Sequence, residues 1–277
     1  MSILQPEDYK EPACIFCTDF YQPDKQSVTP VPLQRIFAKL DEHLGRNDYA
    51  SAERHLTYWM QEAGENGDLR GLLSLENERM GLYRKLGRKE DALACAKAAL
   101  ELVKKTGLEG SVTSATTCLN AATVYKAFGM ADKALPYYER AQAVYEAHLL
   151  PDDPRLGGLY NNMALALCDL GRYPDARACY EKALGVMQHA EHGALERAIT
   201  QLNLCNLAEA EAGLLEAEDE IEQRLDEAET LLESEDLPRS GYYAFVCEKC
   251  APTFRYYGRF AYAAELEERA QEIYRKG

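Results

Sequence analysis

The sequence contains no run of 18 apolar residues, and this absence argues against a membrane-spanning helix. The first ten residues carry Glu7, Asp8 and Lys10 and lack an apolar core, so we expect no secretory signal peptide. Basic residues are also scarce, because 31 lysines and arginines stand against 46 aspartates and glutamates, a formal net charge of -15. This balance argues against a general nucleic-acid-binding surface and against an anionic membrane as partner.

Recognisable catalytic arrangements are missing as well. None of the five histidines (His43, His55, His148, His189 and His192) is arranged with a serine or cysteine as in a nucleophilic site. His189 and His192 lack the i, i+4 spacing of a helical zinc protease site. We predict no strands, and hence no glycine-rich phosphate loop that follows one. The sequence therefore predicts no enzyme, no cofactor and no metal site.

The nine cysteines are an odd number, and they show none of the spacings of a disulfide framework. This usage favours a reducing compartment, so we expect a cytoplasmic protein. Two Cys-x-x-Cys pairs, Cys14/Cys17 and Cys247/Cys250, leave a zinc-clipped or thiol-redox assembly open as an alternative. The pairs lie near opposite ends of the chain, and we expect the second pair to be buried as small apolar residues.

What the sequence does have is a period of 42 residues. Five glycines lie 42 residues apart and a sixth follows after 45: Gly45, Gly87, Gly129, Gly171, Gly213 and Gly258. An alanine follows most of them by five residues, at Ala50, Ala92, Ala134, Ala176 and Ala263. In the fifth copy Ile221 takes this place, which indicates a three-residue insertion after Gly213. A fixed period of this length is typical of a repeat architecture in which each unit packs on its neighbours.

Each period contains two predicted helices. Apolar residues recur at helical spacing in Leu159–Leu170, Gly171 ends that helix in a left-handed conformation, and Pro174 suits the first turn of the next one. Residues 1–30 hold four prolines and no helical period, so we expect an extended N-terminal arm before a repeat domain of residues 31–277. The fold class is all-α, with six helix-turn-helix units at about 33–66, 70–107, 111–150, 154–192, 194–236 and 239–276.

Three stretches carry a family resemblance. Tyr160-Asn-Asn-Met-Ala, Leu170-Gly-Arg-Tyr-Pro-Asp-Ala176 and Tyr180-Glu-Lys-Ala-Leu184 resemble the tetratricopeptide repeat. The 42-residue length is similar to that of kinesin light chains, where Asp-Pro or His-Pro leads into a Leu-Asn-Asn-Leu-Ala helix, as Asp153-Pro154 leads into Asn161-Asn162 here. The similarity covers residues 33–276. It implies a right-handed superhelix whose concave wall of first helices binds proteins or peptides.

The resemblance also implies which residues face the groove, namely those 13, 10, 6 and 3 positions before each turn glycine. This stripe carries five basic residues against two acidic ones in an acidic chain, which would attract an anionic ligand. Asparagines on it or beside it offer both a donor and an acceptor to a peptide backbone. Alternatively, the asparagines bridge neighbouring helices and the basic side chains only cover the wall. The predicted peptide-binding residues are Arg35, Lys39, Asn77, Arg84, Lys126, Asn161, Asn203, Asn120 and Asn162.

These features predict a non-catalytic scaffold whose groove holds an extended acidic or carboxylate-ended peptide. The alternative is a sensor of short signalling peptides, as in similar arrays of Gram-positive bacteria, acting through a separate effector. Segment 209–236 holds 13 acidic residues and one basic residue on a helical pattern, which indicates either a solvated face or a docking face for a basic partner. The final helix, 261–276, is a candidate for self-association because no further unit covers it.

Overall fold

A computed structural model describes residues 28–190 and 193–276. The predicted arm, Cys14, Cys17 and His192 lie outside these ranges, apart from the arm's last three residues. The described ranges contain twelve α-helices and no strands. The helices pair in chain order into six hairpins. The helices are α1 (Leu33–Gly45), α2 (Tyr49–Glu65), α3 (Leu69–Lys85), α4 (Lys89–Lys105), α5 (Val112–Ala127), α6 (Ala131–His148), α7 (Pro154–Asp169), α8 (Tyr173–Met187), α9 (Gly193–Ala212), α10 (Glu218–Leu232), α11 (Gly241–Tyr256) and α12 (Phe260–Lys276).

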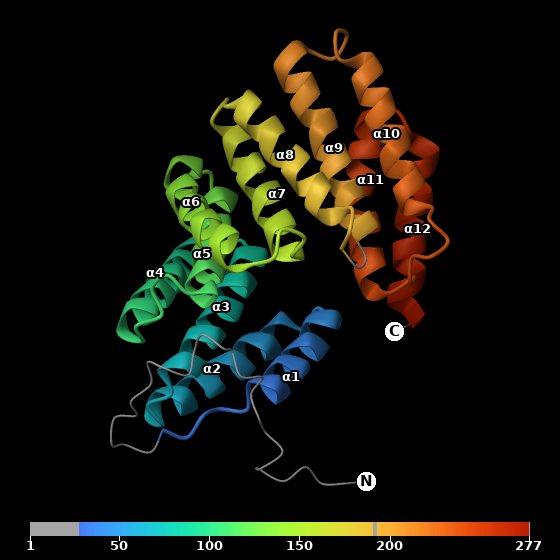
Figure 1. The fold of residues 1–277 in the computed structure, drawn as a ribbon. Coiled ribbons are helices and arrows are strands. Elements are labelled where there is room, and N and C mark those ends of the chain that lie inside the picture. Colours follow the sequence, from blue (N-terminus) through green and yellow to red (C-terminus); the bar gives the residue numbers. More distant parts are fainter. Residues whose placement is uncertain (1–27, 191–192, 277) are drawn as a thin grey trace.

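The hairpins stack in chain order into a curved array, from α1 and α2 at one end to α11 and α12 at the other (Figure 1). From α3 onward, the first helix of each hairpin also packs on the first helix of the next, as α5 does on α7. No comparable packing joins successive second helices within the described residues. The first helices therefore line the inner side of the curve, and we call α3, α5, α7, α9 and α11 the inner wall. The prediction of an all-α repeat superhelix is confirmed.

A left-handed residue lies at the turn between the two helices of every hairpin in the described ranges. Gly87, Gly129 and Gly171 have φ of 69°, 73° and 69°, a region in which most side chains are strained. After α7, the amide of Gly171 donates to the carbonyl of Cys168 and that of Arg172 to Leu167, both at 2.9 Å. The helix end is thereby closed by its own backbone, as the sequence predicts for Gly171.

The first hairpin departs from the register that we predict. Its left-handed residue is Asn47, with φ of 55°, whereas Gly45 is still the last residue of α1. Ala50 is accordingly exposed, and Ala52, five residues after Asn47, is fully buried. Asparagine is among the few residues besides glycine that tolerate this conformation, so a search for glycines places the first turn two residues too early.

Small residues lie where paired helices cross. Ala92, Ala134 and Ala176 are completely buried, and Tyr138 and Tyr180 fill the wider gaps beside them. The buried side chains form four successive clusters along the array rather than one central core. This is the packing expected when each unit contacts only its neighbours.

The acidic segment after α9 is held by arginines from neighbouring helices. Arg177 of α8 bonds both Glu211 of α9 and Glu220 of α10. Arg259, at the start of α12, reaches three carboxylates of α10, on Glu222, Asp226 and Glu229. Many of these acids therefore bind consecutive hairpins together, a role that neither sequence interpretation of the segment included.

Candidate peptide-binding groove

A side-chain joint links α3 to α5 on the inner wall. The Nδ2 of Asn77 donates to the backbone carbonyl of Leu73 at 2.9 Å and to the Oγ1 of Thr117 at 3.2 Å. Its Oδ1 accepts a hydrogen bond from the Nδ2 of Asn120 at 2.9 Å. The Asn77 amide is thus engaged on both sides, and Thr117, which is fully buried, completes the joint. Sequence reasoning missed Thr117 because it considered each repeat separately.

The same joint recurs between α7 and α9. The Oδ1 of Asn161 accepts from the Nδ2 of Asn203 at 3.1 Å and from the Oγ1 of Thr200 at 3.4 Å. Asn161 is only 7% exposed, so it offers little to a ligand. Asn203 consequently holds the place that Asn120 holds in the other joint. All three of Asn77, Asn161 and Asn203 lie ten residues before a turn glycine, so the register predicts one common place for them. In α9 the helix continues to Ala212, directly before Gly213, and this extension shifts Asn203 by one residue.

Asn162 holds the corresponding place on α7, but its partner differs. Its Nδ2 donates to the carbonyl of Gly158 in its own helix at 2.8 Å. The preceding first helix presents Leu119, which has no amide to join. Asn120, Asn162 and Asn203 therefore form a row on three consecutive first helices, and we call them the amide row. Each uses its Nδ2 within the wall, and no Oδ1 of the row has a partner in the described part of the chain.

Two glycines of the inner wall have open space beside them. Gly81 lies inside α3 and Gly158 inside α7, and a Cβ added at either would have no neighbouring atom within 4 Å. A glycine inside a helix costs about 0.5–1 kcal/mol relative to alanine. Because nothing in the described chain needs this space, both glycines allow a ligand to approach the helix backbone closely.

The basic residues of the stripe differ in how firmly they are bound. Arg84 of α3 is exposed and makes no ion pair within residues 28–190 and 193–276. Lys126 of α5 lies 3.8 Å from the carboxylate of Asp169 and is partly neutralised by it. Arg255 of α11 is held by Glu267 through two hydrogen bonds, at 2.7 and 2.8 Å. Of these three, Arg84 is therefore the cation most available to a ligand.

Arg35 and Lys39 do not follow the predicted stripe. Because Asn47 sets the register of the first hairpin, the stripe along α1 passes through Asp41 instead. Lys39 is exposed and pairs with Glu42 of the same helix at 2.5 Å. This register takes Arg35, Lys39 and Glu42 off the stripe and places Asp41 on it, so the net positive charge of the stripe falls by two and the lining is less cationic than the sequence predicts. What remains is a local positive site at Arg84 and Lys126.

The inner wall changes character at its C-terminal end. Tyr242, Phe245 and Tyr256 of α11 are 43%, 49% and 66% exposed, and Tyr242 and Phe245 are stacked. The hydroxyl of Tyr242 donates to Glu196, and that of Tyr256 donates to Glu209 at 2.8 Å. A repeating three- and four-residue spacing through positions 242, 245, 249, 252 and 256 was the sequence signal for this exposed stripe.

Burial raises the thiol pKa of every cysteine in the described chain. Cys247 and Cys250 are buried, as we predict, and Cys205 is buried in the same cluster. Burial raises the pKa of the Cys250 and Cys205 thiols to about 12 and that of Cys95 to about 11. A thiol with a raised pKa stays protonated at neutral pH and is a poor nucleophile or metal ligand. No group of three or more potential metal-binding side chains occurs among the described residues.

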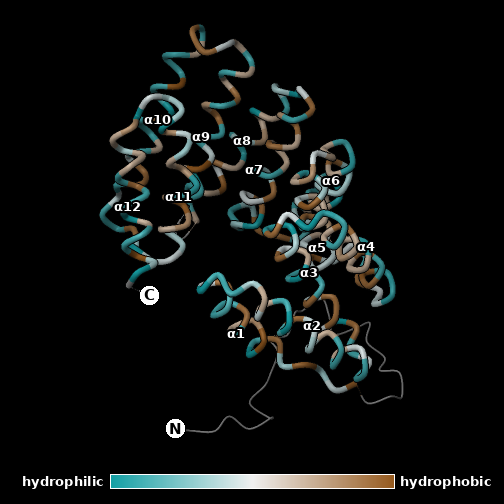
Figure 2. The backbone as a smooth tube through the Cα atoms, turned by 180° about the vertical axis from the view of Figure 1, so that it is seen from behind, coloured by the Kyte–Doolittle hydropathy of each residue, from teal (hydrophilic) through white to brown (hydrophobic). Residues whose placement is uncertain are grey.

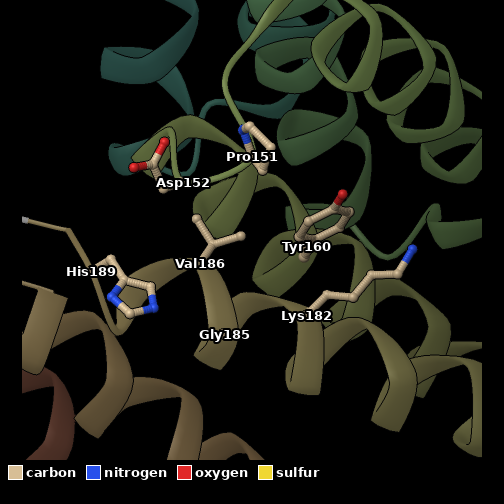
Figure 3. A pocket seen from close by; sticks show the side chains of 7 residues that line it. All are labelled: Pro151, Asp152, Tyr160, Lys182, Gly185, Val186 and His189. Carbon is tan, nitrogen blue, oxygen red and sulfur yellow. The ribbon is translucent and has the colours of Figure 1, made fainter.

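A hollow beside the loop between α6 and α7 has a volume of about 390 Å³ (Figure 3). Tyr160 and Lys182 lie on one side of it, and Asp152 and His189 lie on the other. The Lys182 ammonium lies 5.2 Å from the centre of the Tyr160 ring and 3.9 Å from Glu146. The polar groups do not converge on one point, so the hollow is not assigned a ligand.

Comparison with known proteins supports the repeat fold. Two family profiles, both described as tetratricopeptide repeat, match residues 73–147 and 157–190. A search of curated protein sequences finds no match. None of the helices within the described ranges has the length and apolar character needed to span a bilayer.

Several solved structures share this architecture. BtubC (BKLC) from P. vanneervenii is 22% identical with a TM-score of 0.64, over 74% of this chain and 83% of that one. A putative kinesin light chain of nearly identical TPR-like repeats from Podosopora anserina is 18% identical with a TM-score of 0.51, over 74% and 95%. A Rap protein complexed with competence and sporulation factor is 14% identical with a TM-score of 0.52, over 87% and 74%. At these identities the likeness extends to the fold alone.

Proposed function

We propose, from the premise that this chain is a tetratricopeptide-repeat protein, that it is a non-catalytic scaffold that binds an extended protein segment along its inner wall. The observation that carries the proposal is the amide row. Asn120, Asn162 and Asn203 each have their Nδ2 fixed within the wall, which leaves the Oδ1 as an acceptor for a peptide N–H. Contacts of this kind hold a backbone whatever its side chains.

The spacing of the row suits an extended chain. Packed helices lie about 8–10 Å apart, and an extended peptide rises about 3.3 Å per residue. A segment that crosses α5, α7 and α9 would therefore meet one amide oxygen at about every third residue. The open space at Gly81 and Gly158 lets such a segment lie close to the wall.

Arg84 and Lys126 favour a ligand that carries a carboxylate. Both lie at the C-terminal ends of their helices, α3 and α5, and α3 packs on α5. Since Asp169 partly neutralises Lys126 and Asp41 lies on the stripe of α1, the site has room for one carboxylate rather than a long acidic run. Of the two predicted ligand classes, we therefore favour the peptide with a terminal carboxylate.

Binding of a peptide library to the full chain tests the proposal. Each peptide is made with a free carboxylate and as its amide, and affinity is read by fluorescence anisotropy. We expect Arg84→Glu to weaken binding of the carboxylate form about tenfold, or about 1.4 kcal/mol, and to leave the amide form unchanged. Arg255→Glu is the matched control because Glu267 already holds that side chain. Equal losses in both variants, or none in Arg84→Glu, would refute the carboxylate site.

A second candidate is a sensor of short signalling peptides that acts through a separate effector. It is favoured by the likeness to the Rap protein solved with competence and sporulation factor, although that likeness concerns the fold. Affinity as a function of peptide length separates the two. A scaffold should bind longer segments more tightly as they reach all three amides, whereas a sensor should bind a short free peptide best. Either function suits a cytoplasmic protein with free thiols, such as the seven in the described part of this chain.

A further inference from the structure

The connection between α9 and α10 projects two leucines into solvent. Leu214 is 52% exposed and Leu215 is 82% exposed. They belong to the insertion after Gly213, and the loop stands out as an apolar segment at the top of the array (Figure 2). Arg177 braces the base of the loop by bonding Glu211 and Glu220. Exposed apolar side chains gathered at one place form the kind of surface that a contact with another molecule covers.

Carboxylates surround these leucines. Glu216, Glu218 and Asp219 are exposed and make no ion pair or hydrogen bond within the described ranges. They differ in this from the acids farther along α10, which are held by Arg259. We call Leu214, Leu215 and these three acids the acidic tip.

A groove of complementary chemistry lies on the side of the array away from the inner wall. It occupies about 580 Å³ beside α4 and α6 and has an apolar floor that includes Leu93 and Leu100. Two stacked tyrosines, Tyr125 and Tyr137, close one end, with ring centres 5.6 Å apart. Three lysines on its rim lack an ion pair within the described chain, against a single glutamate, Glu101: they are Lys97, Lys104 and Lys133.

We propose that the acidic tip of one molecule docks into this lysine-rimmed groove of a second copy. The two leucines would cover the apolar floor, and the three carboxylates would meet the three lysines. The matching parts belong to the same chain, and within one molecule they lie far apart along the array (Figure 1). The contact is therefore between different surfaces of two copies, and such head-to-tail contacts build open chains or rings.

The final helix is a weaker candidate for self-association. Its large exposed apolar residues, Phe260 and Tyr274, lie at opposite ends of α12. The exposed face between them carries charged and small residues such as Glu265, Glu268 and Ala264. The acidic tip concentrates its apolar surface at one place and has a groove that fits it.

Sedimentation velocity of the full chain over a range of concentrations tests the proposal. We expect the sedimentation coefficient to rise with concentration at low salt and to rise less at high salt, because screening weakens the lysine–carboxylate contacts. Leu215→Asp and the pair Lys97→Glu with Lys133→Glu should each abolish the rise. Leu150→Asp controls for an apolar residue lost from an exposed turn, at 73% exposure, and Lys89→Glu with Lys105→Glu controls for charge reversal on α4.

Mixing the two inactive variants gives the sharpest result. Leu215→Asp keeps an intact groove, and the double lysine variant keeps an intact tip. Together they retain one working contact, so the mixture should form a dimer that grows no further. A wild-type chain that stays monomeric at all concentrations overturns the proposal. Association that survives in Leu215→Asp, or a mixture that stays monomeric, overturns it as well. In either case the wild-type chain associates through a different interface.

Discussion

The two ends of the inner wall share one backbone design and carry opposite chemistry. From α3 to α9 the wall presents Arg84, helix glycines with open space, and amide oxygens without a partner in the described part of the chain. At α11 it presents exposed aromatics, two of them bonded to Glu196 and Glu209, and its arginine, Arg255, is already paired. In the first part several polar groups have no partner within the described residues, whereas in the second the tyrosine hydroxyls and the arginine are bonded within the protein.

This difference shows that separate parts of a repeat array can carry different charge arrangements. Each hairpin packs only on its neighbours, so substitutions in one hairpin leave the packing of distant ones unchanged. The arginines near the C-terminal end, among them Arg177 and Arg259, are taken up in bonds to the acidic segment. The net charge of -15 therefore describes neither end of the inner wall.

The largest expected effect tests whether the two ends share their packing. Ala134 of α6 and Ala263 of α12 are both fully buried at helix crossings. Ala134→Leu and Ala263→Leu should each lower the free energy of unfolding by about 1–3 kcal/mol, because the added atoms overpack the crossing. Urea unfolding measures both, with the exposed Ala261→Leu as control. A loss in only one variant would show that the two ends are packed differently.

We expect Asn77, in the joint between α3 and α5, to contribute to stability, and Asn162, in the amide row, to contribute to peptide binding. Asn77→Ala should cost about 1–2 kcal/mol, since it leaves Thr117 and Asn120 without their partner. Asn162→Ala should change stability by less than about 0.5 kcal/mol, because its one hydrogen bond in the described chain is to its own helix. It should still weaken peptide binding, because it removes one Oδ1 acceptor of the amide row. Measuring unfolding and peptide binding on both variants distinguishes a residue that joins two helices from one that contacts the ligand. Unchanged binding in Asn162→Ala would exclude the amide row as a peptide site.

Gly81 offers a prediction in which stability and binding move in opposite directions. Gly81→Ala should stabilise α3 by about 0.5–1 kcal/mol and should weaken peptide binding by filling the space beside the backbone. Gly185→Ala in α8, a second helix, removes a helix glycine with equally open surroundings and should leave binding unchanged. Thermal unfolding and anisotropy check the pair. Tighter binding by Gly81→Ala would show that the ligand does not approach α3.

The smallest effect concerns salt. Arg259→Ala should lower stability by about 0.5–1 kcal/mol at low ionic strength, because a partly exposed network contributes modestly. The loss should shrink as salt screens the network. Arg84→Ala should have no such effect, since no ion pair holds Arg84 in the described chain. Unfolding at two salt concentrations compares them, and equal behaviour would contradict the division of charge between the two ends.

Much of the fold can be predicted from residues that recur at a fixed period of 42 residues. Gly87, Gly129 and Gly171 mark turns because a left-handed residue is needed there, and the alanines mark crossings because backbones approach closely. The candidate site followed less well from the same register. Asn47 replaces glycine in the first turn and moves Arg35 and Lys39 off the stripe, and the longer α9 moves Asn203 by one residue.

The sequence by itself determined the all-α class, the six hairpins and, except in the first hairpin, the residues at their turns and crossings, because local backbone and packing demands repeat every 42 residues. Only the tertiary structure decided which asparagines bridge helices, which oxygens remain without a partner and which arginines are already paired. Those outcomes depend on contacts between residues about 40 positions apart, such as Asn77 with Asn120 and Arg177 with Glu220. A single repeat does not specify such contacts, because each needs the neighbouring hairpin to be in place.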